Sequence, residues 1–561
     1  MTDAYDYIVV GGGTAGCVLA AGLSEDATIR VALVEAGPTD SHPYIHIPAA
    51  VAAAIFHPKL GWGYFTEPQP ALNDRRIPLP RGRVIGGSGS INGMAYNRGH
   101  PRDYDDWAAA GNTGWSYREV LPYFIRSEDN EALRGSPYHG VGGPMSVIEI
   151  DRPNPLNNAF LGAMSSLQYR ETPDFNGPEP EGYGLRQASI RAGRRESTAT
   201  AYLRPAMSRK NLTVITDALV AGVAIEEGRA VGVDIERGGQ PTRLEARREV
   251  ILCGGAFGSP QILQLSGVGD GAALKAAGVE VKHHLPDVGA HLQDHLASTV
   301  QMVTDNTQSY GISWRTLPRG AWILLNYALF RRGPLASNVF ESTAFLKSAA
   351  SLDRPDLQFA FQPARRNPTP FPIPVGHGYA LSQVLLYPKS RGTVGLASPD
   401  PRAAPLIDPK LLSDPDDLQP LLRGIRMARG MFAAPAFRGY HATEVAPGPE
   451  TTSEDALVDY IRRTASTVHH PAGTCRMGAD AGSVVDAELR VRGIAGLRVA
   501  DASIFPRLVG GNTNAPVVMV AEKAADMILG RPAPPPADVP PLDPPHGDPP
   551  PPVSGPLSFD R

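Results

Sequence analysis

Residues 5–37 constrain the fold of this chain more than any other stretch, because they have the pattern of a strand, a glycine turn, a helix and a second strand. Gly11, Gly13 and Gly16 have G-x-G-x-x-G spacing. Glu35 comes directly after the second apolar run, about 20 residues beyond these glycines. Gly11 permits the tight turn, Gly13 lets the backbone approach a pyrophosphate, and Gly16 lets the helix pack on the strand. The pattern predicts a nucleotide-binding βαβ unit in which Glu35 accepts hydrogen bonds from an adenosine ribose, and it leaves NAD and FAD both open.

The size and composition are those of an ordinary globular protein. A chain of 561 residues usually forms more than one domain, and a net charge of −4 provides no basic surface for nucleic acid. The three cysteines lie far apart without metal-ligand spacing, so we expect a reducing compartment, no disulfide framework and no metal site. The first residues show no signal-peptide pattern, and no window approaches the ~20 apolar residues of a membrane span. These features predict a soluble cytoplasmic protein.

A second glycine-rich run and several strand patterns follow. Residues 81–93 are dense in glycine and serine, which lets backbone lie against a flat or charged ligand, with a surface loop as the alternative. Residues 212–237 alternate strongly and predict a β-meander with its turn at Gly228. Residues 356–361 and 379–396 have the pattern of strands in a separate sheet.

The remaining segments predict helices and a tail. Residues 318–332 form an apolar helical stretch between arginines, and a buried core helix is favoured over contact with a membrane surface or a substrate entrance. Residues 516–529 have helical period, with Asn514 as the expected N-cap. Beyond Gly530 close to half of the residues are proline, which predicts an extended, mobile tail.

Long motifs recur in a fixed order along the chain. They are RGRVIGGSGSINGMAYNRGHPRDYDDW at 81–107, GAFGSPQILQLSGVG at 255–269, HHPAGTCRMG at 469–478, and LRVADASIFP with GNTNAPVVMVAEKAADMI after it. Together they resemble the glucose–methanol–choline (GMC) oxidoreductase family of flavoenzymes, over about residues 5–530. The phrases RGHPRDYDDW, LPDVGAHLQDH and GNTNAP are most similar to choline-dehydrogenase-like bacterial alcohol dehydrogenases. Some members of that branch oxidise aliphatic primary alcohols and pass electrons to the respiratory chain.

The resemblance implies an α/β fold, mixed with α+β, in which a Rossmann-like FAD-binding domain carries a second, antiparallel β-sheet substrate-binding domain. The expected divisions are 1–298 for the FAD domain, with a lid excursion at about 38–95 and a substrate-side insertion at about 145–195; 299–464 for the substrate domain; 465–530 for a return to the FAD domain; and 531–561 for a disordered proline-rich tail.

The resemblance also implies FAD as the cofactor, and no metal. The expected cofactor contacts are Gly11, Gly13, Thr14, Ala15, Gly16, Glu35, Ala36, Val84, Asn92, Gly93, Met94, Ala95, Val220, Asp501, Ala502 and Thr513. Gly89 stands where serine is usual, which removes a hydroxyl from that position. Ile91 stands where some relatives carry a histidine bonded to the flavin, so we expect FAD to bind non-covalently.

The catalytic residues implied by the resemblance are His470 and Asn512. Alcohol oxidation needs a base for the hydroxyl proton, and a histidine suits because its pKa is near working pH. By itself a histidine in a glycine turn is more often structural; the family pattern assigns His470 as the base, with His469 supporting it. Asn512 can donate to the substrate oxygen but cannot act as a base. The helix after Asn512 would direct its N-terminus at the reduced flavin. The partners would be an alcohol and oxygen or a quinone, in a monomer or homodimer that is cytoplasmic or peripheral to the inner membrane.

Three alternative functions stay open. A choline dehydrogenase or oxidase would need a carboxylate and aromatic side chains around a quaternary ammonium, for which Glu341, Phe340 and Phe345 are candidates. A different flavoenzyme reaction, such as fatty-acid photodecarboxylation, is disfavoured by the presence of both His470 and Asn512. A flavin-binding protein without turnover is disfavoured for the same reason. Uncharged apolar aliphatic or aromatic primary alcohols are the favoured substrates.

Overall fold

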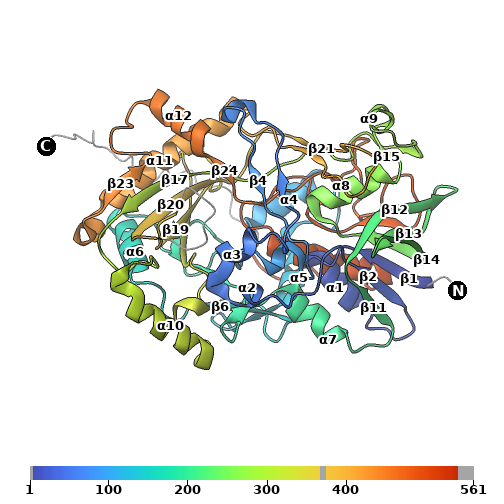
Figure 1. The fold of residues 1–561 in the computed structure, drawn as a ribbon, viewed down its shortest axis with the longest axis horizontal. Helices are drawn as coiled ribbons and strands as arrows, with labels where there is room; N and C mark the ends of the chain where they lie inside the picture. Colours follow the sequence, from blue (N-terminus) through green and yellow to red (C-terminus); the bar gives the residue numbers. More distant parts are fainter. Residues whose placement is uncertain (1–3, 367–374, 541–561) are drawn as a thin grey trace.

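The computed structural model describes residues 4–366 and 375–540, and two large sheets dominate it (Figure 1). Each sheet has 7 strands. One lies at the end of the molecule that holds the N-terminus, and the other lies toward the opposite end (Figure 1). The mixed α/β architecture, with one largely parallel and one antiparallel sheet, confirms the predicted fold class.

The first sheet has a parallel part and an antiparallel part. Its order is β11 (Leu212–Ile215), β2 (Val31–Val34), β1 (Ala4–Val10), β14 (Gln240–Leu252), β13 (Arg229–Arg237) and β12 (Ala218–Glu226), with β25 (Leu497–Val499) also paired to β14. The strands β11, β2, β1, β14 and β25 run parallel, whereas β12, β13 and the start of β14 form antiparallel hairpins. The predicted turn at Gly228 is confirmed, but β11 joins the parallel sheet through β2 instead of the meander.

Helices cover this sheet because its central strands are apolar on both faces. All residues of β2 are buried, as are the residues of β1 after Ala4. Helix α1 (Thr14–Leu23) packs against α13 (Asn514–Leu529), which in turn packs against α5 (Tyr117–Ser127) beside α4 (Pro101–Ala109). The C-terminal helix therefore returns to the first βαβ unit, about 500 residues away along the chain.

The second sheet is antiparallel and has two different faces. Its order is β23 (Thr443–Ala446), β17 (Leu296–Val303), β20 (Gly378–Leu385), β19 (Leu357–Gln362), β18 (Ser342–Leu346) and β7 (Gly182–Leu185), with β24 (Ser466–Thr467) also on β17. In β19, Leu357, Phe359 and Phe361 belong to a core shared with α6 (Leu156–Ser166) and α11 (Leu418–Ala433). The alternate residues Gln358 and Ala360 lie on the opposite face, as the two-residue period of a strand requires.

Further segments differ from the sequence predictions. Of the predicted strand region 379–396, only the part in β20 joins the second sheet, whereas Thr393–Gly395 pairs with Leu406–Asp408 in a separate two-stranded sheet. Helix α10 (Leu317–Phe330) is not a buried core helix: Tyr327 is its only buried residue, and it lies at the edge of the molecule (Figure 1). Residues 531–540 are not a free tail, because Val539 is buried and Ala537 pairs with the backbone of Arg118. The rest of the predicted tail, 541–561, lies outside the described residues. Asn514, the predicted N-cap, is instead the first residue of α13. The N-cap is Thr513, whose side chain makes no capping hydrogen bond.

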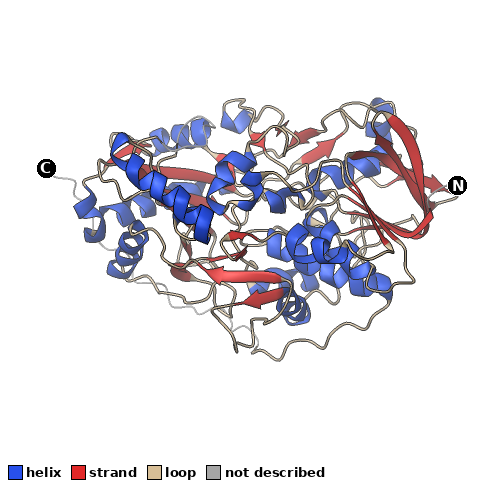
Figure 2. Cartoon of the chain, turned by 60° about the horizontal axis from the view of Figure 1, so that its bottom comes forward, coloured by secondary structure: helices blue, strands red, loops and turns tan. Residues whose placement is uncertain are grey.

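The remaining elements are short, and loops connect many of them (Figure 2). They are the helices α2 (Pro43–His46), α3 (Val51–Ile55), α7 (Arg204–Ala206), α8 (Gly255–Leu265), α9 (Gly271–Ala276) and α12 (Glu454–Thr464), and the strands β3 (Tyr64–Phe65), β4 (Pro78–Leu79), β5 (Glu128–Asn130), β6 (Met145–Glu149), β8 (Gln187–Ala188), β9 (Ile190–Arg191), β10 (Arg194–Arg195), β15 (Val268–Gly269), β16 (His283–His284), β21 (Thr393–Gly395) and β22 (Leu406–Asp408). Among residues 4–366 and 375–540, no helix is long and apolar enough to cross a membrane.

Candidate active site

One large cavity collects most of the predicted site residues. It has a volume of about 1870 Å³, above the 300–1,000 Å³ typical of a site for one small molecule, and residues of both sheets line it. The predicted residues on its wall are Gly11, Gly13, Thr14, Ala15, Glu35, Ala36, Asn92, Gly93, Met94, Ala95, Val220, His470, Asp501, Ala502, Asn512 and Thr513. Two predicted contacts, Gly16 and Val84, do not line it. Gly16 packs beneath the turn, and Val84 is buried in a small apolar cluster with Ile91.

Two helix N-termini open into this cavity. Thr14 and Ala15 of α1 and Asn514 of α13 line it, and neither helix has a side-chain cap or an acidic residue in its first turn. The uncapped N–H groups and the positive ends of both helix dipoles are therefore available to anionic groups of a ligand. Thr14 Oγ1 donates to Asn514 Oδ1 at 3.0 Å and ties the two helix starts together.

That contact gives a physical reason for Gly89. A Cβ at position 89 would lie 2.9 Å from Thr14 Oγ1 and 3.5 Å from Asn514 Oδ1. The hydroxyl of Thr14 thus lies beside the space that a serine side chain at position 89 would enter. A serine at this position would require Thr14 to move.

The glycines of the first turn permit close approaches. A Cβ on Gly16 would lie 1.8 Å from the carbonyl oxygen of Gly11, and Gly11 itself has φ of +102° with its Cβ position 2.5 Å from Cys253 O. Both positions exclude any side chain. Glu35 accepts from the backbone N–H groups of Gly12 and Gly37, each at 2.8 Å, while burial raises the pKa of its carboxyl group to about 7. The turn and the acid are therefore locked to each other.

His470 is the middle member of a line of three polar side chains. Its Nδ1 lies 2.9 Å from Nδ1 of His295, and Nε2 of His295 lies 3.0 Å from the carbonyl oxygen of Leu386. Its Nε2 lies 3.1 Å from Nδ2 of Asn512. His470 and Asn512 line the cavity, whereas His295 is fully buried behind them.

This line fixes the tautomer of His470. A carbonyl oxygen only accepts, so His295 Nε2 carries its proton, and Nδ1 of a neutral His295 must accept from His470 Nδ1–H. The lone pair of neutral His470 is therefore on Nε2, beside Asn512. Burial lowers the pKa of His295 to about 4, which keeps it neutral near pH 7. Burial also lowers the pKa of His470 well below its usual range, and repulsion from Arg81, and from His295 once that ring is protonated, adds to this effect.

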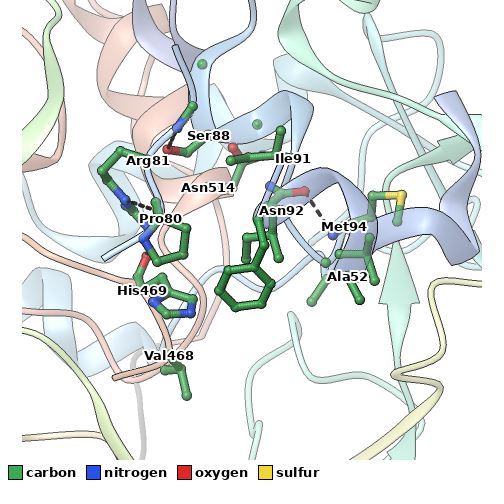
Figure 3. Close-up of a pocket in the computed structure, with 18 of the residues that line it drawn as sticks. Ala52, Pro80, Arg81, Ser88, Ile91, Asn92, Met94, Val468, His469 and Asn514 are labelled. Atoms are coloured by element: carbon green, nitrogen blue, oxygen red, sulfur yellow. Dashed lines mark hydrogen bonds between the residues drawn. The ribbon is translucent and has the colours of Figure 1, made fainter. Parts of the chain in front are cut away.

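The backbone around His470 is also held. Its N–H donates to Asp294 Oδ1 at 2.7 Å, and burial raises the pKa of that carboxyl group to about 7. Arg81 Nη2 donates to the carbonyl oxygen of His469 at 2.6 Å. His469 has a positive φ of 69° and lines the cavity itself. Figure 3 shows Arg81 and His469 across the pocket from Ile91, Asn92 and Met94.

The rest of the wall is apolar on one side and polar on the other. Residues of α3 and α10 supply apolar side chains. The second sheet supplies polar side chains, through Gln358 of β19 and Ser382 of β20, with the small Ala360 between them.

The predicted choline-binding residues do not form a cation site. Both carboxylate oxygens of Glu341 accept hydrogen bonds, from Asn154 and Asn157 and from Tyr310 and Ser337, and Glu341 is fully buried away from the cavity wall. Phe340 lines the cavity, whereas Phe345 packs elsewhere against Phe175.

The comparisons with known proteins agree with this geometry. The family model for GMC oxidoreductases matches in two parts, at residues 5–297 and at residues 388–521. The chain belongs to the GMC oxidoreductase family. An alcohol dehydrogenase (acceptor) of Pseudomonas putida is 45% identical over 527 residues, which cover 94% of this chain and 96% of the relative. An oxygen-dependent choline dehydrogenase of Rhizobium etli is 42% identical over 94% of this chain and 96% of the relative.

A solved structure shows the same fold. Pyridoxine 4-oxidase from Mesorbium loti superposes with a TM-score of 0.85 at 33% identity, over 94% of this chain and 99% of that one. This GMC oxidoreductase is therefore an FAD-dependent enzyme that acts on CH–OH groups, and its relatives include alcohol and choline dehydrogenases.

The cavity of this GMC oxidoreductase fits FAD. The glycine turn of Gly11 and Gly13, the bare N-termini of α1 and α13 and the buried Glu35 provide backbone donors for phosphates and a carboxylate for a ribose on one wall. Cavity volume beyond that of a single small-molecule site leaves room for a substrate beside the cofactor.

Sequence reasoning missed His295, which lies within the phrase LPDVGAHLQDH. The phrase was a signal of family, but a histidine 175 positions before His470 gives no sign that the two rings touch.

Proposed function

We propose that this enzyme oxidises a primary alcohol to the aldehyde, with His470 as the base and Asn512 orienting the hydroxyl. Bound FAD would supply the acceptor for the hydride that leaves the alcohol carbon. The observation that carries the proposal is the chain from Leu386 through His295 to His470, which puts an unprotonated nitrogen on the cavity wall.

Each residue has a separate task in this reaction. His470 Nε2 accepts the hydroxyl proton, because the lowered pKa keeps it neutral and an alkoxide donates hydride far better than an alcohol. Asn512 has a second amide hydrogen for the substrate oxygen, and its Oδ1, buried and without a hydrogen-bond partner among the described residues, is a further acceptor. The bare N-terminus of α13 stabilises negative charge that develops nearby.

FAD is proposed to bind non-covalently. Ile91 is buried in an apolar cluster and lines the cavity, and its side chain offers no nucleophile. Asn92 to Ala95 line the cavity next to it, with Met94 N donating to Asn92 Oδ1 at 2.9 Å, which keeps this backbone in place (Figure 3). FAD released intact by acid precipitation would support this, and flavin that stays with the protein would contradict it.

The decisive experiment is anaerobic flavin reduction by 1-hexanol in His470→Ala. We expect the reduction rate to fall at least about 10²-fold while FAD stays bound, because only the base is removed. The control is His284→Ala, since His284 is exposed and outside the cavity. A near-normal reduction rate in His470→Ala would disprove the assignment, and a loss of bound FAD would show a structural role instead.

Choline oxidation is the second candidate, favoured by the relative from Rhizobium etli. The engagement of Glu341 by four donors argues against it, because a quaternary ammonium would find no free carboxylate there. Flavin reduction by choline in the same assay would restore it.

We also propose peripheral contact with a membrane surface through α10. Leu324, Leu329 and Phe330 are 64%, 63% and 61% exposed, and Arg331 and Arg332 follow them. Apolar side chains beside basic ones suit an anionic interface, from which either oxygen or a quinone could take the electrons. Co-sedimentation with anionic vesicles tests this contact, and Leu324→Ser with Phe330→Ser should abolish it.

A further inference from the structure

The substrate side of the cavity carries positive charge with no acid to balance it. Among the described residues that line the cavity, the acids are Glu35 and Asp501, and both accept backbone N–H groups on the nucleotide side. Five arginines of the described chain line the cavity, and two of them, Arg186 and Arg366, donate to hydroxyl groups of the second sheet. An ionised group without a counter-ion is costly in a protein interior, so the buried Arg186 in particular favours an anion from outside the chain.

Arg186 is the better buried of the two. Its side chain follows β7, only 6% of the residue is exposed, and it lines the cavity. Its guanidinium makes one hydrogen bond within the described residues, from Nη2 to Thr343 Oγ1 at 2.9 Å, and no ion pair. Residues 367–374, which are not described, contain no Asp or Glu. Burial lowers the pKa of Arg186 to about 10, so it remains a cation at neutral pH.

Arg366 is held by hydroxyl groups in the same way. Its Nη1 donates to Thr299 Oγ1 at 2.9 Å and to Ser382 Oγ at 3.1 Å. It forms no ion pair with a carboxylate of the described chain, and desolvation lowers its pKa. Arg366 is exposed, and it lines the cavity.

The sheet register places the hydroxyl groups that hold the two arginines on one row. Thr343 of β18 pairs with Ala360 of β19, Ala360 pairs with Ser382 of β20, and Ser382 pairs with Thr299 of β17. Paired residues point to the same face, and neighbouring strands lie about 4.8 Å apart. The hydroxyl of Thr343, which holds Arg186, is thus about 10 Å from that of Ser382 and about 14 Å from that of Thr299, the two that hold Arg366. The small side chain of Ala360 lies between them and leaves room for a ligand group.

This row is close enough to the proposed base to act on the same substrate. His470, Arg186 and Arg366 line the same cavity, and the charge of Arg186 is among the causes that lower the pKa of His470. A single molecule can therefore present a hydroxyl to His470 and a second group to the arginines. The apolar wall formed by α3 and α10 suits a hydrocarbon body between the two ends.

We propose that the substrate is a primary alcohol that also carries a carboxylate, with Arg186 and Arg366 binding the carboxylate over Ala360. The inference rests on the proposed alcohol oxidation and names its substrate class. Planar guanidinium groups match carboxylates through paired charge-assisted hydrogen bonds. The same charges repel a cationic alcohol such as choline.

The test compares 6-hydroxyhexanoate, its methyl ester and 1-hexanol as reductants of the flavin in the anaerobic holoenzyme. We expect the reduction rate constant divided by Kd to be at least about 10-fold higher for the carboxylate than for the ester. Adipate should compete with 1-hexanol in the wild-type enzyme. A carboxylate no better than its ester, or adipate without effect, would overturn the inference while hexanol oxidation stands. If none of the three alcohols reduces the flavin, the proposed function fails first.

Variants separate anion binding from other roles of the arginines. Arg186→Gln and Arg366→Gln should each lower the ratio of hydroxyhexanoate to hexanol efficiency about 10- to 100-fold. Arg243→Gln, which removes a surface ion pair with Asp234 on the outer part of the first sheet, should leave the ratio unchanged. An equal loss for all three reductants would assign Arg186 to the flavin or the alkoxide and contradict the inference. If a variant loses FAD, the inference is decided in the wild-type enzyme, by its preference for 6-hydroxyhexanoate over the methyl ester and by the competition with adipate.

Discussion

The nucleotide side and the substrate side of the cavity are built in different ways. Around the first glycine turn, backbone groups and missing side chains form the wall, and Gly11 and Gly13 are adjacent to the helix whose N-terminus they expose. On the second sheet, side chains form the wall, and they come from strands far apart in the sequence. The first wall can hold the same cofactor under many sequences, provided that its glycines remain. The second can change its substrate through single side chains.

The largest effect is expected from Gly16→Ala. The new Cβ would lie 1.8 Å from the carbonyl oxygen of Gly11, so α1 must move away from β1. We expect destabilisation of about 3 kcal/mol or more and loss of FAD, measured as the melting temperature and the flavin absorbance of the purified protein.

Gly430→Ala is the matched control in the substrate half. Its Cβ would meet nothing within 4 Å, and Gly430 lies in α11, so the change should be neutral or stabilising by up to about 1 kcal/mol. If Gly16→Ala behaves like Gly430→Ala, the backbone account of the nucleotide wall is wrong.

A smaller effect is expected from His295→Leu, which removes the acceptor for His470 Nδ1–H. The reduction rate should fall about 10- to 100-fold, since the tautomer of the base is no longer fixed. His295→Asn, whose side-chain oxygen lies near the lost Nδ1, should recover part of the rate.

The pH profile distinguishes positioning from simple damage. Because the pKa of His470 is lowered, the base is neutral through pH 6.5, and the rate should fall only at lower pH as the ring takes up a proton. Below about pH 4 His295 is itself protonated and repels a protonated His470, so His295→Leu should move the acid limb to higher pH. An acid limb at the same pH in His295→Leu as in the wild-type enzyme would contradict the electrostatic link between His295 and His470.

The smallest effect is expected from removing residues 531–540, which lie along the nucleotide half. Ala537 N donates to Arg118 O at 2.7 Å, Arg118 Nε donates back at 3.0 Å, and Val539 is 4% exposed. A chain ending at Gly530 should lose about 2 kcal/mol relative to one ending at Pro540, with flavin reduction unchanged. Equal melting temperatures for the two truncations would show that this contact adds nothing.

Local patterns predicted the nucleotide half well. The strand, turn and helix of residues 5–37 and the turn at Gly228 were predicted from local patterns, since each depends on neighbours in the chain or on two-residue alternation. The antiparallel second sheet was implied by the family resemblance. The prediction that α10 is a buried core helix was wrong, because an apolar helix without a polar face is compatible with burial and with exposure.

The sequence by itself determined the cofactor turn, the family and the candidates His470 and Asn512, because these are encoded in contiguous motifs. Only the tertiary structure decided that His295 contacts His470 and that the carboxylate of Glu341 already accepts hydrogen bonds. It also decided that the hydroxyls holding Arg186 and Arg366 lie on one row of the second sheet. The physical reason is that strand register and loop closure bring together residues whose spacing along the chain carries no information about their contact.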